Sequence, residues 1–537
     1  MLELINLTLP LEAGLKDRQD EVIKKAVKKL FKQDASLIDT TRLRRLSVDA
    51  RKKSHITFIA SLAITSKHEQ RLLDLGIKNL RPLDEKIYRP KAIQSSGPKD
   101  PIVVIGAGCA GIFAGLTLAE AGLCPIILER GAASHKRTQD IKDFNASGIL
   151  NSESNIQFGL GGAGTFSDGK LTTNTNSPFH SYVKQSFVNA GAPQEILWRA
   201  KPHIGSDLLP DIVQNIAHKI EKLDGKLIYN SKFVAFEEIS SEQLLVHYEH
   251  DGRDLELKAS RMILATGHSA RDTFEYLYKQ GLTMERKKFA MGVRIEHLQH
   301  HINASQYGRF AGHPALGAAD YKLVAHISKE DSAYTFCMCP GGEVVNASSE
   351  QGLLCTNGMS NFARDGLNAN AGFLVGIDPK DLAGSSPLAG IELQRDLERK
   401  AFIAGDGGYR APVQLLGDFL HKQSGASPHK VKPSFPQGYT LCNLDTILPD
   451  KISNTLRKAI PLMAKKLHGF DDPEAVLTAV EARSSSPLRI LRDSENLCSV
   501  SHPRIIPCGE GAGYAGGIMS AAADGVRCAQ SIISLFA

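Results

Sequence analysis

The first hundred residues alternate between strand-like and helix-like spacing of their hydrophobic positions. Apolar residues at every second position predict a strand, and apolar residues three and four apart predict an amphipathic helix. The resulting order is β-α-β-β-α-β, which predicts a ferredoxin-like α+β domain over residues 1–95. The expected elements are a strand at Leu2–Leu9, a helix over residues 22–31, strands at Leu43–Ala50 and His55–Ile64, a short helix near Gln70–Leu75 and a closing strand near Lys86–Ile93.

From residue 100 the pattern becomes that of a nucleotide-binding fold. The unbroken apolar run Ile102–Ile105 predicts a strand buried in a parallel sheet, and it leads directly into G-A-G-C-A-G at Gly106–Gly111. Between a strand and a helix, G-x-G-x-x-G makes a tight turn and lets the backbone approach a pyrophosphate. The next predicted strand ends at Glu129. This carboxylate is expected to accept hydrogen bonds from a ribose, which favours FAD or NAD over NADP.

Two later stretches match the same glycine pattern in a different context. Gly159–Gly164 does not follow a buried strand, so we interpret it as a loop. Gly511–Gly516 follows the apolar strand Ile505–Cys508, but only 21 residues remain after it, too few for an independent NAD-binding unit. We therefore interpret this stretch as the last piece of a split flavin-binding fold. A helix beginning near Ile518 would direct its positive end at the flavin.

Residues between these pieces predict a further domain and a middle strand. Ala259–Leu264 reads as a strand that runs into A-T-G at residues 265–267. Residues 285–499 interrupt the nucleotide fold and are expected to form a mixed sheet, with 405–440 as a loop excursion. The expected strands there are Gly292–Glu296, Lys322–Ile327 and Ala333–Met338, and the expected helices are Glu392–Ala404 and Leu456–Leu467.

The fold class is therefore α/β, with a Rossmann-like FAD-binding fold split in sequence, an inserted α+β cap or substrate domain and the N-terminal domain. A chain of 537 residues is long enough for about three domains. The expected boundaries are 1–95 for the N-terminal domain, 100–284 for the first part of the FAD-binding domain, 285–499 for the inserted domain and 500–537 for the C-terminal part.

Charge is distributed unevenly. Residues 1–99 carry 21 Lys and Arg against 12 Asp and Glu, a net charge of +9, whereas residues 100–537 carry −3. A basic surface of this kind can hold the phosphates of RNA. A solvated helix face is favoured over RNA binding, because one Trp and 6% aromatic residues offer few rings for base stacking. No apolar run reaches the length of a membrane span, and we expect a cytoplasmic protein without a membrane partner.

The chain resembles the FAD-dependent oxidoreductases of the glutathione-reductase-like class, through Gly106–Gly111 with Glu129, A-T-G-H-S at residues 265–269 and P-C-G-E-G-A-G-Y-A-G-G-I-M at 507–519. More narrowly it resembles a bacterial family of uncharacterised FAD-dependent dehydrogenases, through segments 159–171, 291–297, 336–350 and 481–490. The resemblance implies FAD as cofactor. The expected FAD-binding residues are Gly106, Gly108, Cys109, Ala110, Gly111, Glu129, Arg130, Gly162, Gly164, Thr165, Val234, Ala265, Thr266, Gly267, Gly509, Glu510, Gly517, Ile518 and Met519.

Five residues are candidates for catalysis: Asp168, Lys170, Arg294, Cys339 and Arg483. Asp168 and Lys170 lie in the glycine loop, where a lysine could meet the flavin or the substrate, although Asp168-Gly169 also reads as a plain turn. Arg294 and Arg483 could orient an anionic substrate or pair with Glu296 and Glu481. Cys339 and Cys337 could be a redox pair, but two buried small hydrophobic residues are favoured. The histidine and cysteine spacings predict no metal site and no disulfide scaffold.

These features predict an FAD-dependent oxidoreductase that transfers a hydride between flavin N5 and a small organic substrate bound under residues 285–499. NADH or NADPH could act as a transient electron donor, although no complete second Rossmann unit is present. Two alternatives are a flavin-dependent RNA-modifying enzyme that uses the basic N-terminal domain and a non-catalytic FAD-binding redox sensor. The sequence does not define the substrate, the electron donor or the oligomeric state.

Overall fold

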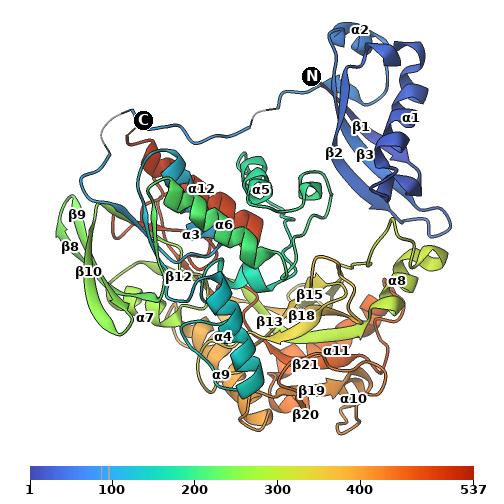
Figure 1. The fold of residues 1–537 in the computed structure, drawn as a ribbon. Helices are drawn as coiled ribbons and strands as arrows, with labels where there is room; N and C mark the ends of the chain where they lie inside the picture. Colours follow the sequence, from blue (N-terminus) through green and yellow to red (C-terminus); the bar gives the residue numbers. More distant parts are fainter. Residues whose placement is uncertain (86, 95–96, 537) are drawn as a thin grey trace.

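The N-terminal domain is a four-stranded antiparallel sheet with strand order β2-β3-β1-β4. The computed structural model of the chain describes residues 1–85, 87–94 and 97–536. Figure 1 shows this domain, in blue, at one edge of the molecule with α1 lying along the sheet. The element order is the β-α-β-β-α-β that the hydrophobic pattern predicts. The elements are β1 (Leu2–Leu9), α1 (Gln19–Phe31), β2 (Thr40–Asp49), β3 (Thr57–Thr65), α2 (Glu69–Asp74) and β4 (Leu80–Pro82).

The closing strand lies earlier than the sequence predicts. Expected near Lys86–Ile93, it is instead Leu80–Pro82, which pairs with Leu2–Leu4 of β1. Residues 87–93 form neither helix nor strand, and Lys86 lies outside the described residues. Pro90 has no N–H to donate to a sheet, and the N–H of Ile93 bonds to the carbonyl of Ala121 at 3.0 Å. This segment is therefore tied to the nucleotide-binding part.

The N-terminal domain contacts the rest of the chain through the edge of β2. The N–H of Leu46 donates to the carbonyl of Trp198 at 2.8 Å, and the N–H of Ala200 donates to the carbonyl of Leu46 at 2.9 Å. These bonds cover part of an exposed strand edge, which otherwise presents unpaired backbone groups. Arg309 also donates to the carbonyl of Ser54 at 2.9 Å.

A five-stranded parallel sheet forms the nucleotide-binding core, with strand order β23-β11-β5-β6-β7. In β5, Ile102 and Val104 face the core formed with α3, α6 and α12, whereas Val103 and Ile105 face the core under α7 and the sheet β8-β9-β10. Both faces are covered, which explains the unbroken apolar runs. The C-terminal strand β23 completes a sheet begun 400 residues earlier in the chain, as its register of Ile505 opposite Met262 shows. The elements are β5 (Ile102–Ile105), α3 (Cys109–Glu120), β6 (Ile126–Leu128), α4 (Ser134–Ser147), α5 (His180–Asn189), α6 (Leu209–Lys222), β7 (Lys226–Ile228), β8 (Ser231–Ser240), β9 (Gln243–His250), β10 (Arg253–Ala259), β11 (Arg261–Leu264), α7 (Arg271–Lys279), β23 (Ile505–Pro507) and α12 (Ile518–Ile533).

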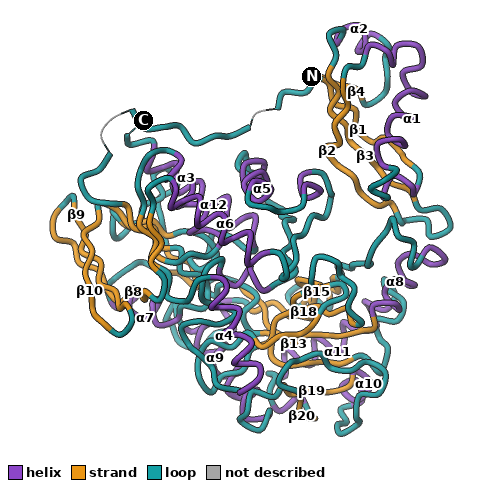
Figure 2. The backbone as a smooth tube through the Cα atoms, in the orientation of Figure 1, coloured by secondary structure: helices purple, strands orange, loops and turns teal. Residues whose placement is uncertain are grey.

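The inserted region is built on a mixed seven-stranded sheet with order β14-β15-β18-β13-β21-β19-β20. Figure 2 shows its strands as a group separate from those of the nucleotide-binding sheet. Helix α11 packs its apolar face on this sheet, with Leu456, Ile460 and Met463 buried. The elements are β12 (Met284–Arg286), β13 (Phe289–Leu298), α8 (Gln299–Tyr307), β14 (Val324–His326), β15 (Ser332–Cys339), β16 (Glu343–Asn346), β17 (Thr356–Met359), β18 (Asn368–Ile377), α9 (Ala389–Ala404), β19 (Ala411–Leu415), α10 (Leu416–His421), β20 (Tyr439–Leu441), α11 (Asp450–Ala464), β21 (Val476–Glu481) and β22 (Leu488–Ile490).

The expectation that residues 405–440 form a loop excursion is wrong in part, because β19 (Ala411–Leu415), α10 (Leu416–His421) and the first residues of β20 (Tyr439–Leu441) lie in this range. Ala411–Leu415 is strand β19, buried along its whole length between β20 and β21. The strand was not predicted because its short apolar run contains Pro412 and lies among Gly, Pro and Ser residues, a composition typical of loops. Residues 423–438, which follow α10, contain no helix or strand.

Candidate cofactor and substrate site

A cavity of about 930 Å³ lies where the nucleotide-binding sheet meets the inserted sheet. One end is formed by the glycine turns after β5 and β11 and by the loop before α12. The other end is formed by residues of β15, β21 and the loops around 170, 320 and 364. A site at the carboxyl ends of parallel strands is the expected position for a nucleotide in an α/β fold.

The glycine turn after β5 has the shape that a pyrophosphate requires. Gly106 has a φ of +96°, and its N–H bonds to the carbonyl of Leu128 at 2.7 Å. A Cβ on Gly111 would lie 1.8 Å from the carbonyl oxygen of Gly106, so only glycine lets α3 begin this close to the turn. The first turn of α3, which starts at Cys109, offers unpaired N–H groups to an anion.

The loop at 159–164 lies against this turn. The N–H of Gly161 donates to the carbonyl of Ala107 at 2.8 Å. Gly162 has a φ of +62°, and a Cβ there would lie 2.9 Å from the Cα of Gly108. The loop is therefore not a second Rossmann turn, in agreement with the sequence interpretation. It packs directly against the turn after β5, and both Gly108 and Gly162 line the cavity there.

Arg137 of α4 anchors this loop, and sequence reasoning missed it. Its guanidinium is completely buried and donates to the carbonyls of Asn155 at 2.8 Å, Leu160 at 2.8 Å and Gly162 at 2.9 Å. Burial without a contacting carboxylate lowers the pKa of Arg137 to about 10. A single arginine on a polar helix carries no sequence signal for this role.

Glu129 lies at the end of β6, is buried and lines the cavity. Its carboxylate accepts the N–H groups of Ala107 at 2.7 Å, Gly131 at 2.9 Å and Gly159 at 2.8 Å. A carboxylate offers about four lone-pair sites, so one remains for a ribose hydroxyl. Glu129 thus holds both glycine loops together in addition to its expected role.

Most of the expected cofactor residues come together around this end of the cavity. Ala265 and Thr266 follow β11, and Glu510 accepts the N–H of Gly517 at 3.3 Å just before α12. Arg130 is held by Glu153 at 2.7 Å and stacks over the ring of Phe158 at 4.2 Å. The lining residues among those expected are Gly106, Gly108, Cys109, Ala110, Glu129, Arg130, Gly162, Gly164, Ala265, Thr266, Gly267, Glu510, Gly517 and Ile518.

Five expected cofactor residues lie outside the cavity lining. Gly111 and Gly509 are close-packing positions, because a Cβ on Gly509 would lie 2.7 Å from that of Ala110. Thr165 is buried and donates to the carbonyl of Leu160, and Met519 is buried in the core under α12. The side chain of Val234 is 45% exposed on β8, and its neighbour Phe233 lines the cavity instead, because successive strand residues point to opposite faces.

At the other end of the cavity, Asp168 holds two cations. Its carboxylate oxygens lie 2.6 Å from the Nζ of Lys170 and 2.5 Å from the Nη2 of Arg364. Burial opposes ionisation of Asp168, but Lys170 and Arg364 outweigh it and hold the pKa at about 2. Lys170 and Arg364 line the cavity, whereas Asp168 lies behind them.

Arg294 and Glu481 form a buried ion pair beside these residues, with Nη1 and Oε2 2.9 Å apart. The expected partner of Arg294, Glu296, instead accepts from Asn368 at 2.9 Å. Glu481 lines the cavity and Arg294 lies behind it. Burial, opposed by Arg294, raises the pKa of Glu481 to about 7. This side chain was not predicted as functional.

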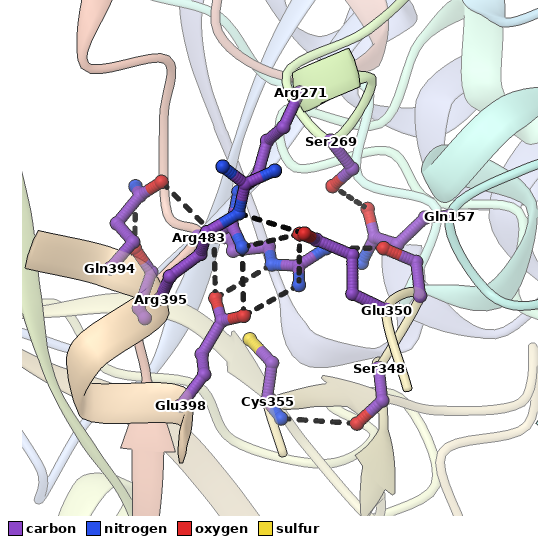
Figure 3. A network of polar contacts seen from close by, with 12 residues as sticks. Gln157, Ser269, Arg271, Ser348, Glu350, Cys355, Gln394, Arg395, Glu398 and Arg483 are labelled. Atoms are coloured by element: carbon purple, nitrogen blue, oxygen red, sulfur yellow. Dashed lines mark hydrogen bonds and ion pairs between the residues drawn. The ribbon is translucent and has the colours of Figure 1, made fainter. Parts of the chain in front are cut away.

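Arg483 belongs to an ion-pair network that joins the domains (Figure 3). Its guanidinium contacts both carboxylate oxygens of Glu398, at 2.8 and 2.6 Å, and Arg271 contacts the same two oxygens at 2.7 and 2.9 Å. The expected pairing with Glu481 is therefore wrong. Although Arg483 lines the cavity, its donors are committed to Glu398 and to Ser349.

Of the remaining candidates, Cys339 is fully buried behind the cavity wall, whereas Cys337 lines it. Tyr321 also lines this region, and its buried hydroxyl has no hydrogen-bond partner among the described residues. Elsewhere in the described part of the chain, Cys508, Asp524 and Cys528 place a potential metal-ligating atom each within 4.8 Å of one another. The Arg492 guanidinium already contacts the Asp524 carboxylate at 2.6 Å and supplies the positive charge there.

Comparisons with known proteins identify relatives of this chain. Residues 288–484 match the family model "FAD-dependent protein, C-terminal domain-like", and residues 1–65 match a domain of unknown function (DUF8436). An "Uncharacterized protein" of Clostridium beijerinckii is 42% identical over 540 residues, which cover 99% of this chain and 98% of the relative.

Among solved structures, the chain is similar to a flavoprotein/dehydrogenase from Cytophaga hutchinsonii, with 12% identity, coverage of 81% of this chain and 77% of that chain, and a TM-score of 0.35. It is also similar to CtdE in complex with FAD, with 13% identity, coverage of 80% and 82%, and a TM-score of 0.30. The family match, rather than these low scores, identifies FAD as the cofactor.

The residues present fit FAD. Gly108 and Gly162 line the cavity without side chains, so a phosphate can approach their backbones, and the start of α3 supplies N–H donors to it. The start of α12, preceded by Gly517 with a φ of +86°, would hold the second half of the cofactor. Within the described residues, no helix combines the length and the apolar composition required to cross a bilayer.

Proposed function

This chain belongs to the same protein family as the Clostridium beijerinckii relative, and with FAD as its cofactor we propose that it is an oxidoreductase acting on a small organic substrate. The observation that carries the proposal is the single cavity shared by the nucleotide-binding turns and the inserted sheet. A chain that only bound FAD would not require this second compartment, lined by Lys170, Cys337 and Glu481.

When bound, FAD supplies a two-electron acceptor that takes a hydride at N5. The chain's own residues provide the groups that bind the substrate and transfer its protons. Glu481, with a pKa of about 7, can accept or donate a proton of the substrate near neutral pH. The hydroxyl of Tyr321, buried and unpartnered among the described residues, can donate a hydrogen bond to a substrate oxygen.

The charges at this end of the cavity favour a substrate with an anionic group. Lys170 and Arg364 share the one carboxylate of Asp168, which leaves one positive charge facing the cavity. A carboxylate on the substrate would complete this cluster. Water would be excluded from the reacting atoms by Phe336 and Met338, which also line this region.

RNA modification is not part of the proposal. Several of the basic residues of 1–99 are already paired, since Arg44 and Arg81 both contact Glu3, and Arg42 contacts Glu85 at 2.6 Å. The lysines on α1 are exposed, and Figure 1 shows α1 on the outer side of the N-terminal sheet, away from the nucleotide-binding helices.

The first experiment is the visible spectrum of the purified protein under anaerobic conditions, before and after addition of NADH or NADPH. An oxidised flavin spectrum is expected, and bleaching by either nucleotide would identify the electron donor. If neither nucleotide reduces the flavin, reduced carboxylic acid metabolites are the next electron donors to test. Protein expressed with excess flavin that contains no FAD would overturn the proposal.

A further inference from the structure

Cys337 and Cys339 occupy an irregular end of strand β15. The pairing of β15 with β18 shifts register between Phe336 and Cys339, and Cys337 has a φ of +41°, a left-handed conformation that residues with a side chain rarely adopt. Strain of this kind persists only where the surrounding structure enforces it, and it often lies at functional sites. Here it interrupts the strand at the cavity wall.

The two cysteines contact each other. The Cys339 thiol donates to the Cys337 carbonyl oxygen at 3.2 Å, and it is close enough to the Cys337 thiol to lower the pKa of that thiol. In a regular strand, Cα atoms two residues apart are separated by about 6.6 Å, near the upper limit for a disulfide, and their Cβ atoms are farther apart than the roughly 4 Å that a disulfide spans. The register shift and the positive φ at Cys337 take this segment out of regular strand geometry, so an S–S bond would form by adjusting an irregular segment rather than a paired strand.

Two cationic side chains contact the segment that carries both cysteines. The Nη2 of Arg294 lies 3.1 Å from the Cys337 carbonyl oxygen and 3.8 Å from the Cys339 sulfur. Lys170 donates to the carbonyl of Met338, between the two cysteines. The Cys339 thiol and these cations lower the pKa of Cys337 below its usual range, whereas burial opposes the shift. A thiolate at Cys337 would face the cavity, with Cys339 buried behind it.

We propose that Cys337 and Cys339 are a redox-active dithiol that exchanges two electrons with the FAD in the same cavity. In the oxidising direction, the two thiols lose two protons and two electrons as one S–S bond forms, and FAD takes up both electrons and both protons. The reverse step breaks the S–S bond and regenerates two thiols. The inference rests on the proposed function only in requiring bound FAD.

The chain offers a competing thiol pair, and the charges around it differ. Cys508 lies beside Cys528. The Cys528 Sγ lies 3.4 Å from the Nη1 of Arg492. Arg492, which pairs with Asp524, is the cation that contacts this pair, whereas Arg294 and Lys170 both contact the segment that carries Cys337 and Cys339. Cys508 also lines the cavity, but the Cys528 thiol and burial raise its pKa. The two contacting cations and the lowered pKa of Cys337 favour Cys337 as the electron donor.

The test is an anaerobic reductive titration of the air-oxidised holoprotein with dithionite. The wild-type protein is expected to take up about four electrons per FAD, two for the flavin and two for the disulfide. Cys337→Ser and Cys339→Ser are expected to take up about two. Cys124→Ser, at an exposed position, is the matched control and should behave as the wild type.

Cyanogen bromide provides a second readout that does not depend on flavin, because it cleaves after Met338, between the two cysteines. In oxidised protein, the fragments 292–338 and 339–359 should remain joined until a reductant is added, and Cys339→Ser should abolish the link. Cys355→Ser should preserve it, which excludes the other cysteine of the second fragment.

Separate fragments in the oxidised wild type, or uptake of about two electrons, would overturn the proposal. Uptake of about four electrons by Cys337→Ser would also overturn it and would assign the extra pair to Cys508 and Cys528. The flavin spectrum of each variant reports FAD binding separately, so failure of the dithiol is distinguishable from failure of the proposed function.

Discussion

Glu398 of α9 and Arg483, just beyond β21, form a two-point ion pair at 2.8 and 2.6 Å with the carboxylate fully buried. Arg271, at the start of α7, binds the same two oxygens from the nucleotide-binding domain. One carboxylate therefore joins three elements from two domains. Since Arg483 lines the cavity, this network also holds one of its walls in place.

Glu398→Gln is expected to lower the free energy of unfolding by about 3–5 kcal/mol, because it leaves two buried guanidinium groups to share the partly exposed carboxylate of Glu350 as their counter-charge. Urea unfolding followed by circular dichroism measures the change. Glu392→Gln, on the same helix with an exposed side chain, is the control and should change stability by less than about 0.5 kcal/mol. Equal effects of the two substitutions would contradict the assigned role.

Asp168→Asn is expected to destabilise the protein in a pH-dependent way. The pKa of Asp168 is lowered from 3.8 to about 2 in the folded protein, so its contribution to stability is present above pH 4 and is lost as the pH falls towards 2. The wild type should exceed the variant by about 2–3 kcal/mol at pH 7, and the difference should shrink in acid. A difference independent of pH between 2 and 5 would show that the carboxylate charge is not the cause.

Much of the nucleotide-binding end could be predicted from sequence because its chemistry is local. Gly106 to Gly111 are constrained by a turn and a helix start within one segment, and Glu129 lies at the end of the next strand. Glu398 could not be predicted, because its partners Arg271 and Arg483 lie far away in sequence and only the folded chain brings them together. The same holds for Glu481, whose raised pKa arises from burial on an inserted sheet that carries no motif.

Gly162→Ala is expected to weaken FAD binding at least about tenfold, since every 1.4 kcal/mol is a factor of ten. The new Cβ would lie 2.9 Å from the Gly108 Cα, so the two glycine loops that form this wall of the cavity would have to separate, and the φ of +62° disfavours any side chain. Gly376→Ala, where a Cβ would meet nothing within 4 Å and φ is not positive, is the matched control. Retention of FAD after gel filtration measures the effect. Full retention in Gly162→Ala would argue against these two glycine loops as the phosphate site.

Glu481→Gln is expected to remove a pH dependence of stability that the wild type shows between pH 4.5 and 7. The pKa of Glu481 is raised from 4.5 to about 7, so the folded state binds more protons than the unfolded state in this range and its stability falls as the pH rises. The fall should amount to about 3 kcal/mol.

The Glu481→Gln variant has no titrating group at this position. Its stability relative to the wild type should therefore increase with pH over this range. Losing the charge partner of Arg294 adds a cost that is the same at every pH and does not change this trend. Urea midpoints measured at half-unit steps of pH give this difference directly. Parallel profiles for the two proteins would mean that Glu481 is ionised throughout and is not the proton-transfer group of the cavity.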